Sequence, residues 1–301
     1  MHYCFIINNA PSKALNVQKI TNQIEHLGTA IDYEIYKTTA VRSTTEFVCN
    51  YCRTNPDREI CFVACGGDGT INETATGMMM GGTSNKHLAV LAYGSGNDFV
   101  KYYPDKDFRN IDNLLLGQPH DIDIMKIDDS HYSINVCNIG FDSIVGRIAN
   151  NLNHRGWKCG YRLGVLYAIL TSMRYNIDLM VDGERINEGK QLFHCTLGNN
   201  NHVGNEFCCS PYACNNDGLI EVGVCKTCTR IKFFMSLIHN YRKGTHLDNP
   251  KTRKYFIYRR AHQIDIHSHK PIDLVIDGEL LPGQDFHVEI IPQAISLIIP
   301  A

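Results

Sequence analysis

The sequence predicts an α/β domain followed by a β-rich domain. In the first 120 residues short apolar runs alternate with helical patterns, which is typical of parallel strands joined by helical crossovers. Beyond them, strand-like runs separated by turn residues favour an antiparallel β-sandwich. With 301 residues, 44% of them hydrophobic, the chain can bury two cores. We therefore expect a Rossmann-like α/β domain at 1–120 and a β-sandwich domain at 121–292, while the last strand, within 293–301, can return to the first domain.

Each element follows from its own run of residues. In the first domain the pattern predicts strands at 3–7, 32–36, 60–64 and 88–92, with helices at 17–27, 44–52 and 70–80. In the second it predicts strands at 122–127, 132–138, 177–181, 192–197, 219–224, 264–267, 274–276 and 286–291. Helical spacing returns only at 161–175 and 231–243, and a final strand is expected at 295–299.

Composition excludes several classes of protein. Lys and Arg number 29 against 31 Asp and Glu, and this net charge of −2 gives no electrostatic case for a nucleic-acid partner. We see no signal peptide, and the longest apolar stretch, 163–170, is shorter than the roughly 20 residues of a membrane span. A basic cluster of Arg253, Lys254, Arg259 and Arg260 is either a solvated face or a contact for anionic lipid headgroups.

Thirteen cysteines without a secretory signal indicate reduced thiols and a cytoplasmic protein. The pairs Cys49/Cys52 and Cys225/Cys228 have the spacing of zinc ligands. A zinc site would have to join the pairs across the whole chain, so we favour small buried side chains.

The run Gly66-Gly67-Asp68-Gly69-Thr70 directly follows the buried strand 60–64. Glycines at the carboxyl end of a parallel strand let backbone N–H groups approach phosphate oxygens, and the next helix points its positive end at the same place. A carboxylate among phosphates is explained if Asp68 holds Mg²⁺, and Glu73 in the first helical turn can serve the same cluster. A plain tight turn capped by Asp68 is the alternative, which the polar Thr70, Asn72 and Glu73 make less attractive.

A second glycine turn, Gly94-Ser95-Gly96-Asn97-Asp98-Phe99, follows the next strand. Turns after neighbouring strands of one sheet line a single crevice, which is where such folds bind ligands. The two turns therefore predict one phosphate-binding crevice.

Together, the two motifs resemble the diacylglycerol kinase catalytic-domain family, which includes bacterial lipid kinases and sphingosine kinases. The family pattern joins Gly-Gly-Asp-Gly-Thr to an Asn-Glu step, here Asn72-Glu73, and continues to Pro-x-Gly-Thr-x-Asn-Asp-Phe, where this chain has Ala92 and Ser95 for the Pro and the Thr. The resemblance implies ATP and Mg²⁺ as cofactors. It assigns nucleotide contacts to Asn8, Thr38, Gly66, Gly67, Asp68, Gly69, Thr70, Glu73, Gly94, Ser95 and Asn97. The loop after Asn8 departs most from the family pattern.

The resemblance extends through the second domain. Asp123, the segment Asn138-Ile139-Gly140-Phe141-Asp142 and the late Asp277-Gly278-Glu279 match family positions. By resemblance, Asp277 or Glu279 takes the proton of the substrate hydroxyl, with Asp277 the first choice, and Asp68 and Asp123 complete the catalytic set. Some members hold a structural Mg²⁺ at the position of Asp217, with backbone carbonyls at Cys214 and Leu219. Asp182-Gly183-Glu184 repeats the three letters, is not marked by the resemblance, and warns that they also suit a hairpin turn.

The predicted function is an ATP-dependent kinase acting on a lipid hydroxyl, most simply diacylglycerol. Such a protein would visit the inner membrane face from the cytoplasm, and the resemblance is compatible with a homodimer. Residues 163–170 would either line a groove for acyl chains or face the core. Two alternatives stay open: a dinucleotide kinase with the same glycine run, and a lipid-binding regulatory protein on a retired kinase scaffold. Diacylglycerol, phosphatidylglycerol and a sphingoid base are all candidate acceptors.

Overall fold

The computed structural model describes residues 1–9, 14–28, 30–40, 42–140, 175–187, 191–204, 206–226 and 237–301. These form two compact units. The first comprises Met1–Ile124 and Ile291–Ala301, and the second Met125–Ile290. The sequence places the corresponding boundaries after residues 120 and 292. The chain passes from one unit to the other within β5 (Gln118–Ile127) and again within β16 (Glu279–Ile299).

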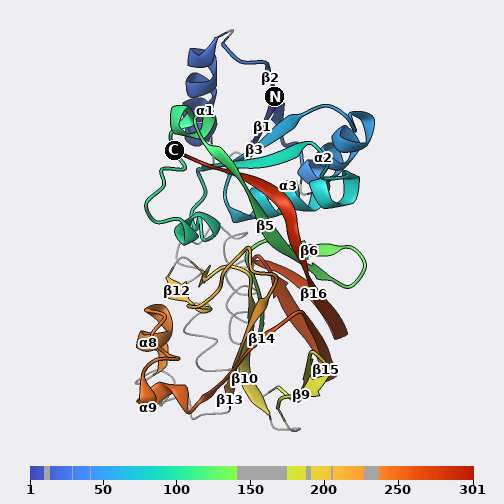
Figure 1. Cartoon of the computed structure of the whole chain (residues 1–301), viewed down its shortest axis with the longest axis vertical. Coiled ribbons are helices and arrows are strands. Elements are labelled where there is room, and N and C mark those ends of the chain that lie inside the picture. The colour runs from blue at the N-terminus through green and yellow to red at the C-terminus, as the bar shows by residue number, and fades with distance from the viewer. Residues whose placement is uncertain are drawn as a thin grey trace. The chain divides into compact units, whose positions relative to one another are not determined.

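The first unit is a parallel sheet covered by helices on both faces (Figure 1). Its strands lie in the order β16-β4-β3-β1-β2, and each neighbouring pair is parallel. Besides the end of β16, the strands are β1 (His2–Ile7), β2 (Tyr33–Lys37), β3 (Ile60–Gly66) and β4 (Lys86–Ala92). The helices are α1 (Ala14–Leu27), α2 (Ser43–Thr54), α3 (Asp68–Gly81), the 3₁₀ turn η2 (Phe99–Tyr102) and α4 (Ile111–Leu115).

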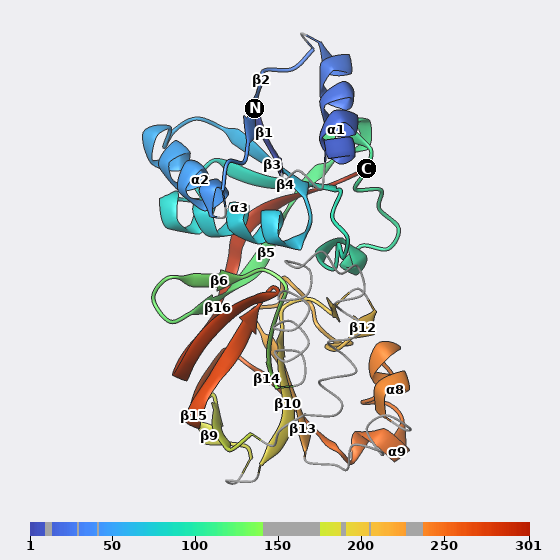
Figure 2. The ribbon, with the colours of Figure 1, turned by 180° about the vertical axis from the view of Figure 1, so that it is seen from behind.

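Burial on both faces explains why the central strands read as unbroken apolar runs. Alternate side chains of a strand point to opposite faces. Phe5 and Val63 pack with Ile20 and Ile24 of α1 on one face. The other face carries α2 and α3, which lie side by side in Figures 1 and 2. The two glycine turns therefore follow strands β3 and β4, which are packed on both faces.

The second unit is an antiparallel assembly of strands in the order β14-β13-β10-β7-β15-β16, with β8 also on β15. Its remaining strands and helices are β6 (His131–Ser133), β7 (Val136–Gly140), β8 (Ile177–Val181), β9 (Glu184–Arg185), β10 (Leu192–Gly198), β11 (His202–Val203), β12 (Phe207–Cys208), β13 (Ile220–Lys226), α8 (Ile238–Arg242), α9 (Pro250–Arg253), β14 (Phe256–Ala261) and β15 (Gln263–Ile276). One face of the sheet carries a core that includes Ile139, Leu197 and Leu274.

The expected fold class, an α/β domain with a β-sandwich-like domain, is confirmed. The structure differs in three elements. The strand expected at 132–138 is two strands, β6 and β7, because the turn between them is bound by a carboxylate described below. The runs 264–267 and 274–276 belong to one strand, β15, and the runs 286–291 and 295–299 both belong to the 21-residue β16. Residues with positive φ or a register shift interrupt the alternation without ending these strands.

Some expectations fall outside the described residues. These are the helix at 161–175 with its groove-lining segment 163–170, the start of the helix at 231–243, Cys228, and the loop residues 10–13. Among the helices that the structure describes, none has the length and apolar character needed to span a bilayer.

Candidate functional site

The first glycine turn joins β3 to α3. Gly67 is the N-cap of α3, which begins at Asp68, two residues earlier than expected. No side chain caps this helix end; Thr70 N donates to Gly67 O at 2.9 Å, and the N–H of Gly69 before it is suited to an anion. Gly69 is exposed, and a Cβ built on it meets nothing within 4 Å. The turn thus presents backbone donors and a helix terminus at the carboxyl edge of the sheet.

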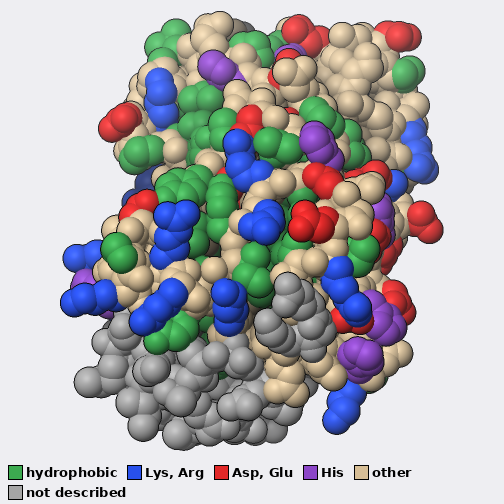
Figure 3. All heavy atoms as spheres, turned by 60° about the horizontal axis from the view of Figure 1, so that its bottom comes forward, with side chains coloured by type: hydrophobic (Ala, Val, Ile, Leu, Met, Phe, Trp, Pro, Cys, Tyr) green, Lys and Arg blue, Asp and Glu red, His purple; other side chains and the backbone are tan. Residues whose placement is uncertain are grey.

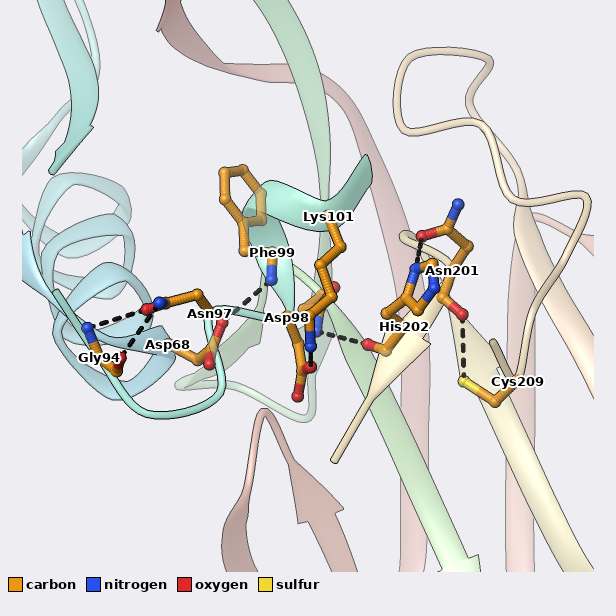
Figure 4. A network of polar contacts seen from close by, with 10 residues as sticks. Asp68, Gly94, Asn97, Asp98, Phe99, Lys101, Asn201, His202 and Cys209 are labelled. Atoms are coloured by element: carbon orange, nitrogen blue, oxygen red, sulfur yellow. Dashed lines mark hydrogen bonds and ion pairs between the residues drawn. The ribbon is translucent and has the colours of Figure 1, made fainter. Parts of the chain in front are cut away.

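The second glycine turn packs directly against the first. A Cβ at Gly67 would lie 2.9 Å from the Cα of Gly94, so neither backbone could approach the other with a side chain in place. Asn97, at φ 53, shapes this turn because Gly94 N donates to its Oδ1 at 2.9 Å and its Nδ2 donates to Gly94 O at 3.1 Å (Figure 4). Both turns therefore form one continuous surface of backbone groups.

Asp68 lies between the two turns. Its Oδ1 accepts a hydrogen bond from Phe99 N at 3.0 Å (Figure 4). Burial raises the pKa of the Asp68 carboxyl above its ordinary value, and the neighbouring Asp98 carboxylate adds to the rise, whereas the Phe99 N–H opposes it. Asp98 in turn forms an ion pair of 2.6 Å with Lys101. Two adjacent carboxylates fit Mg²⁺, which proteins usually hold through one or two carboxylates together with phosphates and water.

Asp98 and Lys101 were not among the residues singled out by the sequence. The signal for Asp98 was present in the Asn97-Asp98 step, but nothing in one sequence says that its carboxylate faces Asp68. The ion pair with Lys101 follows only from the 3₁₀ turn that starts at Phe99.

Other predicted nucleotide contacts form a rim around the first turn. Asn8 Nδ2 lies 3.4 Å from Thr70 Oγ1. Thr38 Oγ1 accepts from Asn9 N at 3.1 Å. Glu73 accepts from Arg42 N at 3.2 Å through its Oε1, so its carboxylate fastens the segment before α2. Gly66, which ends β3, is buried, and Ser95 is exposed.

Asp123 is a buried residue of β5. Its Oδ1 accepts from Gln293 N at 2.8 Å, where β16 adopts a positive φ of 51. Across the described ranges, no three Asp, Glu, His or Cys side chains gather as ligands for a metal ion. In this unit the expected acidic cluster therefore consists of Asp68 and Asp98. The carboxylate of Asp123 binds the backbone of β16 at Gln293.

Asp277 begins the two-residue turn between β15 and β16. Its Oδ1 accepts from Ser133 Oγ at 2.7 Å, Asn135 N at 3.1 Å and Val136 N at 2.9 Å. Its Oδ2 accepts from Ile134 N at 2.9 Å. Asn135 Nδ2 also donates to His202 O at 3.0 Å, and His202 contacts Asn201 (Figure 4). The Asp277 carboxylate thus binds the turn that separates β6 from β7.

Two other turn aspartates in the second unit also accept hydrogen bonds from backbone N–H groups through their carboxylates. Asp182, at φ 47 like Asp277, accepts from His262 N and Gln263 N, each at 3.0 Å. Asp128, at φ 50, accepts from His287 N at 2.8 Å. An aspartate at the first position of a hairpin turn here serves to bind a neighbouring strand end. Glu279 differs, because it is exposed and its carboxylate forms no hydrogen bond or ion pair with any residue in the described ranges.

The expected cation site at Asp217, Cys214 and Leu219 includes a carboxylate that contacts an arginine. Asp217 Oδ1 accepts from Leu219 N at 3.1 Å, and Oδ2 forms an ion pair with Arg260. Arg260 Nε also lies 3.1 Å from Oε1 of Glu221, which is 2% exposed. The guanidinium supplies a positive charge at this carboxylate, and the assignment of a structural metal ion to Asp217 stays a prediction.

Every cysteine in the described part of the chain is free. Cys49 and Cys52 lie buried in α2 of the first unit, and Cys225 lies in β13 of the second. Burial raises the pKa of Cys52 to about 11, which keeps this thiol protonated in the metal-free protein. The interpretation as small buried side chains is therefore preferred for Cys49 and Cys52.

Comparison with known proteins adds to this geometry. A family model described as the diacylglycerol kinase catalytic domain matches residues 2–127, and one described as the YegS C-terminal NAD kinase beta sandwich-like domain matches residues 135–299. Proteins named probable lipid kinase YegS-like, from Yersinia pestis (strain Pestoides F) and Yersinia pseudotuberculosis serotype O:1b, are 29% identical over 245 residues, which is 79% of this chain and 78% of theirs. A solved structure titled as a diacylglycerol kinase from Bacillus anthracis str. Sterne superposes with a TM-score of 0.69 at 17% identity, covering 99% of this chain and 96% of that one.

Proposed function

The chain belongs to the family of YegS-like lipid kinases built on the diacylglycerol kinase catalytic domain, and from that premise we propose that it transfers the γ-phosphoryl group of ATP to the hydroxyl of diacylglycerol. Family membership makes it a lipid kinase. The observation that carries the nucleotide part is the pair of glycine turns in backbone contact, with Asp68 between them. The names of the family model and of the solved relative support diacylglycerol as the acceptor.

The first unit would hold the nucleotide. Backbone N–H groups of residues 66–69 and the start of α3 are suited to phosphate oxygens, and Asn8, Thr38, Thr70, Ser95 and Asn97 border them. Asp68 and Asp98 would hold Mg²⁺, which neutralises phosphate charge during transfer. Burial and, after it, the neighbouring Asp98 carboxylate raise the pKa of Asp68, and a bound cation would favour the ionised form again.

The second unit would supply the proton acceptor. As the acceptor hydroxyl forms a bond to the γ-phosphorus, the bond from that phosphorus to the β–γ bridging oxygen breaks, ADP leaves, and the hydroxyl proton must move to a base. Three donors converge on Oδ1 of Asp277 and one reaches its Oδ2, so this carboxylate is held by the turn at residues 133–136, whereas Glu279 has no such partners in the described ranges. We therefore assign the base to Glu279, and to Asp277 the task of positioning the turn that carries it.

One assay tests the proposal. The protein is incubated with γ-labelled ATP, Mg²⁺ and a mixed lipid extract, and the labelled product is identified. Phosphatidic acid is expected, and Asp68→Ala should abolish the labelling. Label in another lipid would replace diacylglycerol as the acceptor. Label in NAD without labelled lipid would indicate a dinucleotide kinase, and labelling unchanged by Asp68→Ala would contradict the mechanism.

A further inference from the structure

A surface of positive charge covers α8 and α9 in the second unit. Lys243 follows α8, Lys251 and Arg253 lie in α9, and Lys254 follows α9; all four are exposed. The two helices are neighbours, since Asn249 at the N-cap of α9 donates to Asn240 of α8 at 3.3 Å. Lys and Arg side chains gather on the left of Figure 3, the side on which Figure 1 places α8 and α9. We call Lys243, Lys251, Arg253 and Lys254 the basic surface.

The charges of the basic surface are not held in ion pairs by described residues, although the exposed Asp248 carboxylate lies nearby and binds the Tyr212 hydroxyl. None of the four forms an ion pair within the described part of the chain. Two nearby arginines do form ion pairs: Arg242 pairs with Glu206 at 2.5 Å, and Arg260 pairs with Asp217 and Glu221. The sequence-based cluster of Arg253, Lys254, Arg259 and Arg260 therefore mixes two kinds of residue, because Arg260 belongs to an internal network and only the others can meet a partner.

An exposed aromatic side chain lies beside these charges. Tyr212 is 44% exposed, and its hydroxyl donates to Asp248 in the loop before α9. Its ring packs edge-on against Tyr258 at a centroid distance of 5.6 Å. Tyrosine suits the boundary between water and hydrocarbon, since its ring is apolar and its hydroxyl polar.

These features suit an anionic bilayer better than a nucleic acid. The chain as a whole carries a net charge of −2, so positive charge is confined to a local surface. A lipid kinase must also reach an acceptor that resides in a bilayer, and no helix in the described ranges can cross one. We propose that the basic surface docks the protein onto anionic phospholipid headgroups and so brings it to its lipid acceptor. This inference rests on the proposed function only where it says that docking brings the protein to a lipid acceptor. Binding to vesicles is measured without any kinase reaction.

Vesicle sedimentation tests the docking. The full-length protein is mixed with vesicles of equal parts phosphatidylglycerol and phosphatidylcholine, or of phosphatidylcholine alone. Each Lys or Arg close to an anionic surface favours binding about fivefold, so Lys251→Glu/Arg253→Glu/Lys254→Glu should lower the partition coefficient by about 100-fold or more. Because the Debye length is about 3 Å at 1 M salt, high salt should release the wild type.

A matched control separates the surface from net charge. Lys19→Glu/Lys106→Glu/Lys270→Glu reverses three exposed lysines elsewhere and changes the total charge equally, so it should bind anionic vesicles far better than the first variant. Thermal unfolding checks that both variants fold, and Lys251→Gln/Arg253→Gln/Lys254→Gln gives a milder version of the test. With acceptor dispersed in detergent micelles, the first variant should keep wild-type turnover, which distinguishes lost docking from lost catalysis.

Three results would overturn the inference. The first is equal binding of the wild type to neutral and anionic vesicles, or binding to neither. The second is wild-type binding by the folded reversal variant. The third is tighter binding to duplex DNA than to anionic vesicles at the same salt concentration, which would identify a nucleic-acid surface. Absence of kinase activity in micelles, together with intact vesicle binding, would contradict the proposed function and leave the docking in place.

Discussion

At the scale of single residues, the two acids of the Asp277-Gly278-Glu279 step have different surroundings. Asp277 accepts four hydrogen bonds from residues 133–136, and Glu279 is exposed. Glu279→Gln should lower kcat by about 100-fold to 10,000-fold, because a positioned base contributes that much, while nucleotide affinity stays near the wild-type value. Turnover numbers with nucleotide binding by calorimetry measure this. A kcat near that of the wild type would remove Glu279 from the mechanism.

Asp277→Asn should act through stability. An amide group in place of Oδ2 would face the N–H of Ile134, so a buried donor would meet a donor. We expect unfolding free energy to fall by about 1–3 kcal/mol, as measured by urea denaturation. The matched variant is Asp182→Asn, whose carboxylate has the same kind of turn contacts and no proposed part in transfer. Native stability combined with a lost kcat in Asp277→Asn alone would make Asp277 the base.

The sequence predicts which residues belong to the candidate site better than it predicts what each residue does there. The glycines, Asp68 and Asn97 were placed together by their positions after neighbouring strands, which is a local pattern. The contacts of Asp277 could not be anticipated, because its donors lie more than 140 positions away in sequence. Arg260 was grouped with surface charges for the same reason: the strand register that sets it opposite Glu221 exists only in the folded sheet.

At the scale of elements, the contact between the two glycine turns predicts a paired result. Gly67→Ala would push a Cβ to 2.9 Å from Gly94 Cα, and backbone cannot yield as a flexible side chain can. We expect a loss of about 1–3 kcal/mol in stability and weaker nucleotide binding. Gly69→Ala, whose Cβ has open space, should not lose stability. Equal unfolding midpoints and nucleotide affinities for the two variants would contradict the packing argument.

The loop before β13 gives a second prediction at this scale. Arg260 bridges Asp217 and the buried Glu221, and burial together with Asp217 raises the pKa of the Glu221 carboxyl. Arg260→Met should therefore cost about 1–3 kcal/mol. Arg259→Met should stay within about 0.5 kcal/mol, because this exposed neighbour donates only to the carbonyl of Tyr258 among the described residues. In the Asp68→Ala variant, which lacks a carboxylate assigned to the nucleotide-bound Mg²⁺, thermal unfolding should not respond to EDTA or Mg²⁺. A lower melting temperature of that variant in EDTA would support a structural metal ion at Asp217.

At the scale of the whole molecule, the lengths of β15 and β16 were the least predictable feature of the fold. Apolar runs correctly located both ends of β15 and the C-terminal end of β16, but β16 begins at Glu279, before the predicted run at 286–291. Lys270-Pro271 in β15 and Pro292-Gln293 in β16 read as breaks. A proline is tolerated where a strand is irregular, and the register shift between His267 and Ile272 provides such a place in β15. Tertiary pairing, which a single sequence does not display, carries both strands through these points.

The two units should respond differently to acid. His246 is 1% exposed in the second unit and packs at 4.8 Å between the rings of Tyr241 and Phe256. Burial lowers its pKa to about 4, and nearby His194 adds to the fall, although Asp248 and the Asn240 backbone oppose it. The unfolded chain, with a histidine pKa of about 6.5, binds this proton first. Stability present above pH 6.5 is therefore lost as pH drops toward 4, by up to about 3 kcal/mol.

Hydrogen exchange at pH 7 and pH 5 locates this loss. Peptides from α8 to β14 should exchange faster at pH 5, because His194 and His246 lie together in the second unit. Burial also lowers the pKa of His87 in the first unit, but His87 lies in β4, so peptides of α2 and α3 should change less. His246→Phe preserves an aromatic ring between Tyr241 and Phe256 and removes the titrating group, so it should flatten the difference between the two pH values. If that variant kept the full acid sensitivity of the α8–β14 region, the cause would lie in other groups, such as His194, and not in His246.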